Sequence, residues 1–302
     1  MPHFCTLFDI NYASRGLAMM RSLHTHLSDS HIHVLCMDTK TKDFLAALHL
    51  DYLTLVDLDT LETSEPRLSD CKKSRNTAEY CWTLSSVFTR HLLATRPEID
   101  QLTYLDADLL FFSSPQCLLD EMGPRDIAIL EHRYAPHLQH LMQFGRFCVQ
   151  WVSFRRSQTG LECLDTWAEQ CLDWCFAYAD PERYGDQKYL DAWPARYGNK
   201  LAILQNIGAG VAPWNFTQYD LSQDTEESAT LLNVNQQPLV FYHFHQFKKM
   251  RFGLFSHCSY FYSQGRATPK AIYKAYEIAL DEAHADVFRE TGLAQVGVTP
   301  IF

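Results

Sequence analysis

Hydrophobic and polar positions alternate in blocks along the N-terminal part of the chain, and each block predicts one strand or one helix. Apolar runs at residues 4–8, 31–37 and 52–56 have the length of buried strands, whereas residues 15–27 and 44–50 repeat apolar side chains at helical spacing. Strands that alternate with helices predict a mainly parallel sheet with helices packed on it. In such a sheet, ligands gather at the carboxyl ends of the strands.

The same alternation continues toward the C-terminus. The further predicted helices cover residues 78–95, 116–122, 162–178, a segment starting near 184, and 269–280, and the further strands cover residues 102–112, 127–130, 147–154, 201–204 and 239–247. Residues 60–76 are polar and are interpreted as a loop. No repeat or linker divides the chain, so we expect one domain over residues 1–302. Its expected parts are residues 1–115, residues 116–265 and a helical extension at residues 266–302.

Two carboxylates, Asp106 and Asp108, interrupt the apolar run at residues 102–112. In an extended strand, side chains two positions apart point to the same side, so both groups can converge on one cation. Oxygen ligands suit Mg²⁺ or Mn²⁺, and a divalent ion that bridges a diphosphate is a common reason to place carboxylates at the end of a strand. The alternative is that one aspartate caps a turn and the other pairs with a surface arginine.

Composition and charge narrow the range of partners. The chain has 302 residues, a formal net charge of −10 and a pI near 5.7, so it lacks the basic surface that nucleic acids require. Its ten cysteines follow no pairing pattern, and the first residues do not resemble a signal peptide, which favours reduced thiols in the cytoplasm. No apolar run is long enough to span a membrane, although peripheral membrane contact stays compatible with the sequence.

Other polar residues occur where predicted strands end. Asp9, Asn11 and Tyr12 follow the first strand and can supply hydrogen bonds and a stacking ring to a nucleotide base, although a bare turn needs no ligand. Arg75 belongs to a small basic cluster and can reach either a phosphate or a carboxylate. Asp186 follows Gly185 in what resembles the acidic first turn of a helix, and a capping role alone also explains it.

Two later segments carry further candidates. Residues 208–215 form a glycine-containing loop with Trp214, which can line an acceptor pocket or serve only as a turn. His243 and His245 are predicted on one face of the last apolar strand, directly before Lys248. Neutral imidazole binds Mn²⁺, so either histidine is a ligand candidate, and a core histidine is the alternative.

Taken together, these segments resemble the nucleotide-sugar-dependent glycosyltransferases with the GT-A fold, most closely glycosyltransferase family 8 and its bacterial relatives. Residues 104–109 are similar to the Asp-x-Asp metal motif of that family, and residues 8–12 are similar to its first donor-binding turn. Residues 184–190 resemble the segment beside the transferred sugar, and residues 242–248 resemble the late His-x-x-Gly segment with its trailing lysine. The four matches occur in the family's order.

The resemblance implies a GT-A type, Rossmann-like α/β fold with a mixed, mainly parallel central sheet flanked by helices. It also implies that residues 1–115 are the nucleotide-binding half and that residues 116–265 are the acceptor and catalytic half. It implies a hexosyltransferase that uses Mn²⁺ or Mg²⁺ to move a sugar from a nucleotide-diphosphate donor, a UDP-hexose, to a hydroxyl acceptor such as a glycan or lipopolysaccharide, with retention. The implied roles are metal binding by Asp106, Asp108 and His243 (alternatively His245), donor binding by Thr6, Asp9, Asn11, Tyr12, Arg75, Asp106 and Lys248, catalysis by Asp186 and Gln187, and acceptor binding by Trp214 and Asn215.

The chain departs from the family pattern in two places. Cys148 and Gln150 stand where the family usually has Asn and Gly, and Gln246 replaces the usual Gly of the late segment. These changes keep a non-catalytic sugar-nucleotide or carbohydrate-binding protein open as the alternative. A phosphatase of the haloacid dehalogenase type also uses Asp-x-Asp, but its motif lies near the amino terminus and continues into Thr or Val, whereas Leu109 follows here.

Overall fold

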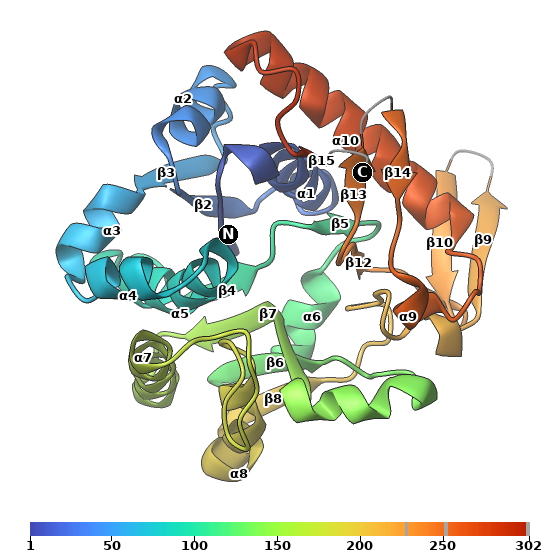
Figure 1. The fold of residues 1–302 in the computed structure, drawn as a ribbon. Helices are drawn as coiled ribbons and strands as arrows, with labels where there is room; N and C mark the ends of the chain where they lie inside the picture. Colours follow the sequence, from blue (N-terminus) through green and yellow to red (C-terminus); the bar gives the residue numbers. More distant parts are fainter. Residues whose placement is uncertain (227–228, 251–252, 300–302) are drawn as a thin grey trace.

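The computed structural model describes residues 1–226, 229–250 and 253–299, and a seven-stranded mixed sheet runs through its centre (Figure 1). In spatial order its strands are β3 (Leu53–Asp57), β2 (His31–Cys36), β1 (His3–Phe8), β4 (Gln101–Leu105), β7 (Phe147–Arg155), β6 (Ile127–Glu131) and β8 (Leu201–Leu204). The pairs β1–β2, β2–β3, β1–β4 and β6–β8 are parallel, and β7 runs antiparallel to β4 and β6. The predicted mixed, mainly parallel sheet is confirmed.

Helices cover both faces of the sheet (Figure 1). One face packs against α1 (Ala13–His26), α2 (Thr39–Ala47) and α10 (Lys270–Thr291), and the other packs against α3 (Leu58–Ser64), α4 (Leu68–Ser74), α5 (Thr77–Thr95) and α7 (Gln158–Asp173). Since strand side chains alternate between faces, Phe4 and Phe8 of β1 join the first core while Cys5 and Leu7 join the second. None of the helices among the described residues is both long and apolar enough to cross a membrane.

Three smaller sheets and several short helices complete the chain. The small sheets pair β5 (Leu109–Phe111) with β12 (Phe241–His243), β9 (Leu221–Glu226) with β10 (Ala229–Val234) and β11 (Gln237–Pro238), and β13 (Lys248–Met250) with β14 (Phe255–Ser256) and β15 (Val298–Thr299). The short helices are η1 (Ile10–Tyr12), α6 (Gln116–Met122), η2 (Pro136–Phe144), η3 (Lys188–Ala192), α8 (Trp193–Tyr197), η4 (Gly198–Lys200), η5 (Phe216–Gln218) and α9 (Tyr260–Ser263).

The C-terminal strand β15 returns to the N-terminal turn of the chain. It runs parallel to β13, and Gly297 just before it has φ +66° and sits against the carbonyl oxygen of Asn11, where no side chain fits. The same Gly297 lies near the guanidinium of Arg15 in α1. The end of the described chain therefore covers one side of the turn after β1.

Two predicted strands are wrong in extent. The run at residues 102–112 is broken into β4 and β5 by a turn at residues 106–108, and β5 pairs outside the central sheet. The run at residues 239–247 has only three residues in β12, after which the chain turns and Gln246 takes φ +62°. In both segments a ladder ends where polar side chains interrupt the apolar run, and apolar composition alone did not reveal that.

Several helices also differ from prediction. The predicted loop at residues 60–76 holds most of α3 and all of α4, which each bury a narrow apolar face through residues such as Leu61 and Leu68. Helix α2 begins five residues early because Asp38 caps it, and α7 begins at a Ser157 cap and ends at Asp173. Residues 184–187 precede the helical segment rather than opening it, so Asp186 is not a residue of a first helical turn.

Candidate active site

Asp106 and Asp108 lie in the turn that follows the carboxyl end of β4. The N–H of Asp106 still donates to the carbonyl of Gln150 in β7, at 3.4 Å, before the chain leaves the central sheet as β5. The Asp106 side chain is 29% exposed and that of Asp108 15% exposed, so both carboxylates are largely shielded from water. Ionised groups shielded in this way require a positive partner.

His243 supplies that partner from β12. The antiparallel pairing of β12 with β5 sets His243 opposite Leu109, and its Nε2 lies 3.0 Å from Oδ1 of Asp108 and 3.9 Å from Oδ2 of Asp106. Its Nδ1 lies 2.9 Å from Oε1 of Gln150, a fully buried residue of β7. Because an amide oxygen only accepts hydrogen bonds, Nδ1 carries the proton and Nε2 is directed toward the carboxylates.

The electrostatics of this group match its geometry. Burial raises the pKa of Asp106 against the attraction of His243. Burial also acts to raise the pKa of Asp108, but the charge and hydrogen bond of His243 lower it, and in return Asp108 raises the pKa of His243 against the effect of burial. The carboxylate of Asp108 thus favours the charged form of the imidazole, while burial disfavours it. Two carboxylate oxygens and one imidazole nitrogen are also ligands that Mn²⁺ accepts, so these side chains fit the implied metal.

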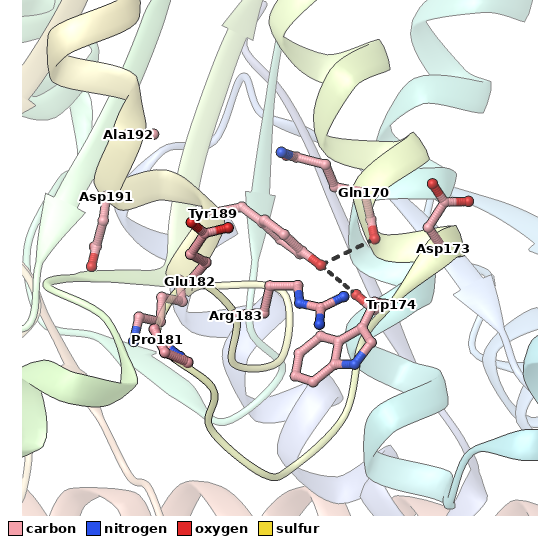
Figure 2. Close-up of a pocket in the computed structure, with 10 residues that line it drawn as sticks. Gln170, Asp173, Trp174, Pro181, Glu182, Arg183, Tyr189, Asp191 and Ala192 are labelled. Carbon is pink, nitrogen blue, oxygen red and sulfur yellow. Dashed lines mark hydrogen bonds between the residues drawn. The ribbon is translucent and has the colours of Figure 1, made fainter.

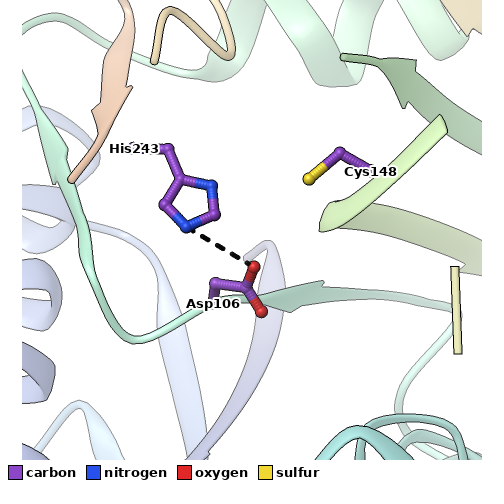
Figure 3. A group of neighbouring side chains, drawn as sticks. All are labelled: Asp106, Cys148 and His243. Atoms are coloured by element: carbon purple, nitrogen blue, oxygen red, sulfur yellow. Dashed lines mark ion pairs between the residues drawn. The ribbon is translucent and has the colours of Figure 1, made fainter. Parts of the chain in front are cut away.

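Cys148 is a further member of the group that the sequence prediction did not include. One ligand atom each from Asp106, Cys148 and His243 lies within 4.8 Å of the others, and Figure 3 shows the Cys148 sulfur facing the imidazole. Cys148 and Gln150 belong to β7, which runs antiparallel to β4 and extends past its end. The altered motif at residues 147–151 was the signal in the sequence, but it did not reveal this position.

His245 is close by but has other contacts. It lies in the turn after β12, and its Nε2 is 3.3 Å from the hydroxyl of Tyr262. Burial lowers its pKa to about 4, and the charge of His243 acts in the same direction. The rings of Trp214 and His245 are 5.5 Å apart, edge to face. Of the two predicted alternatives, His243 is the histidine that contacts the Asp pair.

The predicted acceptor residues lie in the loop after β8. The ring of Trp214 meets that of His243 edge to face at 5.1 Å, and its Nε1 has no hydrogen-bond partner among the described residues. Asn215 is fully buried, and its amide donates to the carbonyls of His132 and Gly210 and accepts from the N–H of Ala212. Asn215 therefore holds the loop in shape. Acceptor contact by either residue stays a prediction.

Asp186 and Gln187 lie in the segment between α7 and η3. The hydroxyl of Ser85 in α5 donates to Asp186 Oδ2 at 2.8 Å, and the Asp186 carbonyl accepts from the indole of Trp167. Burial raises the pKa of Asp186 to about 7 against the Ser85 hydrogen bond, and the charge of Asp106 adds to the rise. Gln187 donates to the carbonyl of Phe144 at 2.8 Å. Asp186 is thus a buried acid within electrostatic reach of the Asp pair.

The turn after β1 also lies within electrostatic reach of the Asp pair. Asp9 caps η1 by accepting from the N–H of Tyr12, and the guanidinium of Arg15 lies 4.5 Å from the centre of the Tyr12 ring. Burial raises the pKa of Tyr12 to about 12, and the charge of Asp108 adds to it, which places this ring near the carboxylates. Arg15 was not anticipated from the sequence. Its Nη2 donates to the carbonyl of Phe247.

Three other predicted donor residues have different surroundings. Thr6 is fully buried in β1, and its hydroxyl has no partner among the described residues. Arg75 is buried and donates to the hydroxyl of Thr83 and the carbonyl of Leu172. Lys248 is exposed at the start of β13. Their contacts with a donor stay predictions.

A separate cavity of about 610 Å³ opens along the segment before η3 (Figure 2). Its walls include Trp174, Arg183 and Tyr189, and the Tyr189 hydroxyl donates to the carbonyls of Gln170 and Trp174. None of the predicted site residues lines it. It is therefore distinct from the group around Asp106.

The sequence was compared with those of known proteins and protein families. No family model matches the chain. The chain is 31% identical over 281 residues to the uncharacterized protein YfnD of Bacillus subtilis (strain 168), covering 92% of this chain and 88% of YfnD. It is 30% identical over 250 residues to the uncharacterized protein YfnF of the same strain, covering 80% of each.

Among solved structures, the galactosyltransferase LgtC in complex with donor and acceptor sugar analogs is similar in fold. The TM-score is 0.53 with 13% sequence identity, over 90% of this chain and 99% of LgtC. At this identity the likeness concerns the fold alone. The chain therefore has the GT-A fold of glycosyltransferases such as LgtC, as the sequence resemblance implied.

Proposed function

This chain belongs to the family of the Bacillus subtilis proteins YfnD and YfnF, and we propose that it is a metal-dependent glycosyltransferase. The proposed reaction moves a sugar from a nucleotide-diphosphate donor, a UDP-hexose, to a hydroxyl acceptor such as a glycan or lipopolysaccharide. The observation that carries the proposal is the meeting of Asp106, Asp108 and His243 at the carboxyl end of β4 in a GT-A fold.

We assign donor binding to residues near this group of side chains. Tyr12 lies near the carboxylates and is 43% exposed, and we propose that its ring stacks on the base while Asp9 and Asn11 contact base and ribose. The family resemblance also assigns Thr6, Arg75 and Lys248 to the donor. The net charge of −10 requires that a diphosphate be held by local cations, because the protein as a whole repels it.

The metal, Mn²⁺ or Mg²⁺, would be held by Asp106, Asp108 and His243 and would neutralise the charge that develops on the departing diphosphate. Gln150 holds a proton on Nδ1 of His243, so Nε2 would become the ligand nitrogen once it releases its own proton to water. The two carboxylates are already close together before the ion binds. Their mutual repulsion when both are ionised costs the metal-free protein free energy.

The transferred sugar is assigned to Asp186 and Gln187. A carboxyl group whose pKa is raised to about 7 is partly protonated at neutral pH, so Asp186 can either donate to or accept from a sugar hydroxyl. In the retaining reaction that we propose, the departing phosphate oxygen takes the proton of the acceptor hydroxyl on the same face of the sugar. That route requires no separate side-chain base. Trp214 and Asn215 are proposed on the acceptor side.

Substitution of Asp108 tests the proposal directly. We expect Asp108→Asn to lower Mn²⁺-dependent release of UDP from a UDP-sugar by about a hundredfold or more while the far-UV circular dichroism spectrum stays the same. The matched control is Asp59→Asn, which changes an exposed carboxylate of α3 in the same way. Turnover by Asp108→Asn at the wild-type rate with saturating Mn²⁺ would refute the assigned role.

The choice between the two histidines has its own test. We expect His243→Ala to weaken Mn²⁺ binding, measured by isothermal titration calorimetry, and His245→Ala to leave it nearly unchanged, because only His243 contacts the carboxylates. An effect confined to His245→Ala would reverse the assignment.

A non-catalytic sugar-nucleotide-binding protein is the second candidate, and the side chain of Gln150 favours it. Where the family usually has Gly, this fully buried amide fills space next to the metal ligands. Both candidates predict that UDP-sugars with Mn²⁺ raise the melting temperature, since both bind the ligand in the native state. Only a transferase releases UDP, so product detection separates them.

A further inference from the structure

We propose that Cys148 is a fourth protein ligand of the metal, and that its sulfur shifts the preference of the site from Mg²⁺ toward the softer ions Co²⁺ and Zn²⁺. The inference rests on the proposed metal-dependent function and names the ligand that decides metal choice. It adds a soft donor to the oxygen and nitrogen donors of Asp106, Asp108 and His243.

The geometry of the strands carries the first step. The group of Asp106, Cys148 and His243 is the one set of three metal-binding side chains found within 4.8 Å of one another in the described part of the chain. In Figure 3 these side chains converge from three segments that are distant in sequence, and the sulfur points toward the other two. Ligands of one ion must approach from different directions, and this arrangement satisfies that requirement.

The backbone explains why Cys148 faces the group. Leu105, the last residue of β4, pairs with Trp151, so β7 continues past β4 alongside the turn that carries the aspartates. Between β6 and β7 the register shifts: Ile129 faces Val152, but Leu130 faces Cys148. A bulge of this kind bends a strand and re-aims its side chains, and bulges are common next to active sites.

The chemistry carries the second step. Thiolate is a soft ligand that suits Zn²⁺ and its neighbours in the transition series, whereas Mg²⁺ takes oxygen ligands. When such an ion binds, the sulfur–metal bond forms and the thiol proton is released to water. The competing explanation is packing alone, because Cys148 also contacts the small apolar cluster that contains Tyr134 and Trp214.

Cobalt spectroscopy distinguishes these explanations in the full-length protein. We expect Co²⁺ to produce a near-ultraviolet sulfur-to-metal charge-transfer band in the wild type, and we expect Cys148→Ser and Cys148→Ala to lose it. The matched control Cys117→Ser changes a half-buried cysteine of α6 and should keep the band. Asp106→Asn should weaken the band, which ties it to this site.

Competition between metals measures the preference. We expect Cys148→Ser to lower the ratio of Zn²⁺ to Mg²⁺ affinity by about tenfold or more, since even the loss of a group that only hydrogen-bonds a metal ligand costs about 10–100-fold in affinity. A wild type without the band, a band that persists in both Cys148 variants, or an unchanged affinity ratio would overturn the inference. If Mn²⁺ binding and UDP release survive such a result, the proposed function stands, whereas a wild type that binds no divalent ion would refute both.

Discussion

Replacement of Asp186 by asparagine should make the metal-free protein more stable and less active. Asp186 is only 5% exposed, and its carboxylate accepts a hydrogen bond from the hydroxyl of Ser85. Asparagine has nearly the same shape and its oxygen can accept the same hydrogen bond, but it carries no charge at any pH. The variant thus removes the cost of burying the ionised carboxylate and also removes the acid proposed beside the sugar.

The size of the effect follows from the pKa of Asp186, which burial raises from 3.8 to about 7. Because the folded-state value lies above the unfolded one, ionisation costs the folded state nothing below pH 3.8. The cost grows as pH rises and levels off above about pH 7. A pKa difference of one corresponds to about 1.4 kcal/mol. The cost of ionising Asp186 in the folded state is therefore about 2 kcal/mol at pH 5 and about 4 kcal/mol at pH 8.

Urea unfolding with EDTA present measures the difference between wild type and Asp186→Asn at both pH values. The expected result is a variant that is more stable at pH 8, by an amount that shrinks by about half at pH 5. UDP release by the Mn²⁺-loaded variant should fall at the same time. A variant that is less stable than the wild type at pH 8, or a stability difference that is equal at both pH values, would show that Asp186 carries no such burial cost.

Three further substitutions test other parts of the structure. Gln150→Ala leaves Nδ1 of His243 without its acceptor and should weaken Mn²⁺ binding by about tenfold in calorimetry, and unchanged affinity would contradict the orienting role. Asn76→Ala removes the capping box of α5 and should lower the free energy of unfolding by about 1 kcal/mol in urea titrations. Phe244→Ala removes a buried ring stacked at 3.7 Å on Tyr276 and should cost about 3–5 kcal/mol, and a loss under 1 kcal/mol would contradict its place in the core.

The sheet was predictable because its strands follow simple rules of pattern. Uninterrupted apolar runs such as β1 and β7 appear at the predicted places, and the alternation with helices gave their mainly parallel arrangement. Asp106, Asp108 and His243 also lie together, but the strand pattern predicted another arrangement of the two aspartates. The two aspartates share a turn rather than one face of a strand, because β5 leaves the sheet to pair with β12.

Several contacts of the site could not be predicted because they join segments that are distant in the sequence. Asp186 resembled a helix cap, yet its carboxylate is paired with Ser85 across the fold. Cys148 stood out only as a departure from a family pattern, since the bulge between β6 and β7 that directs it inward has no local sequence signal. Helices α3 and α4 were missed because a short helix that buries one narrow face is mostly polar in composition.

The packing of Gly297 against the carbonyl oxygen of Asn11 has a consequence for how the protein is made. A ribosome synthesises Asn11 long before Gly297, so the turn emerges from the exit tunnel while the strand that covers it does not yet exist. A nascent chain can therefore fold its first strands and helices early, yet the cover over this turn forms only after Gly297 itself has been translated.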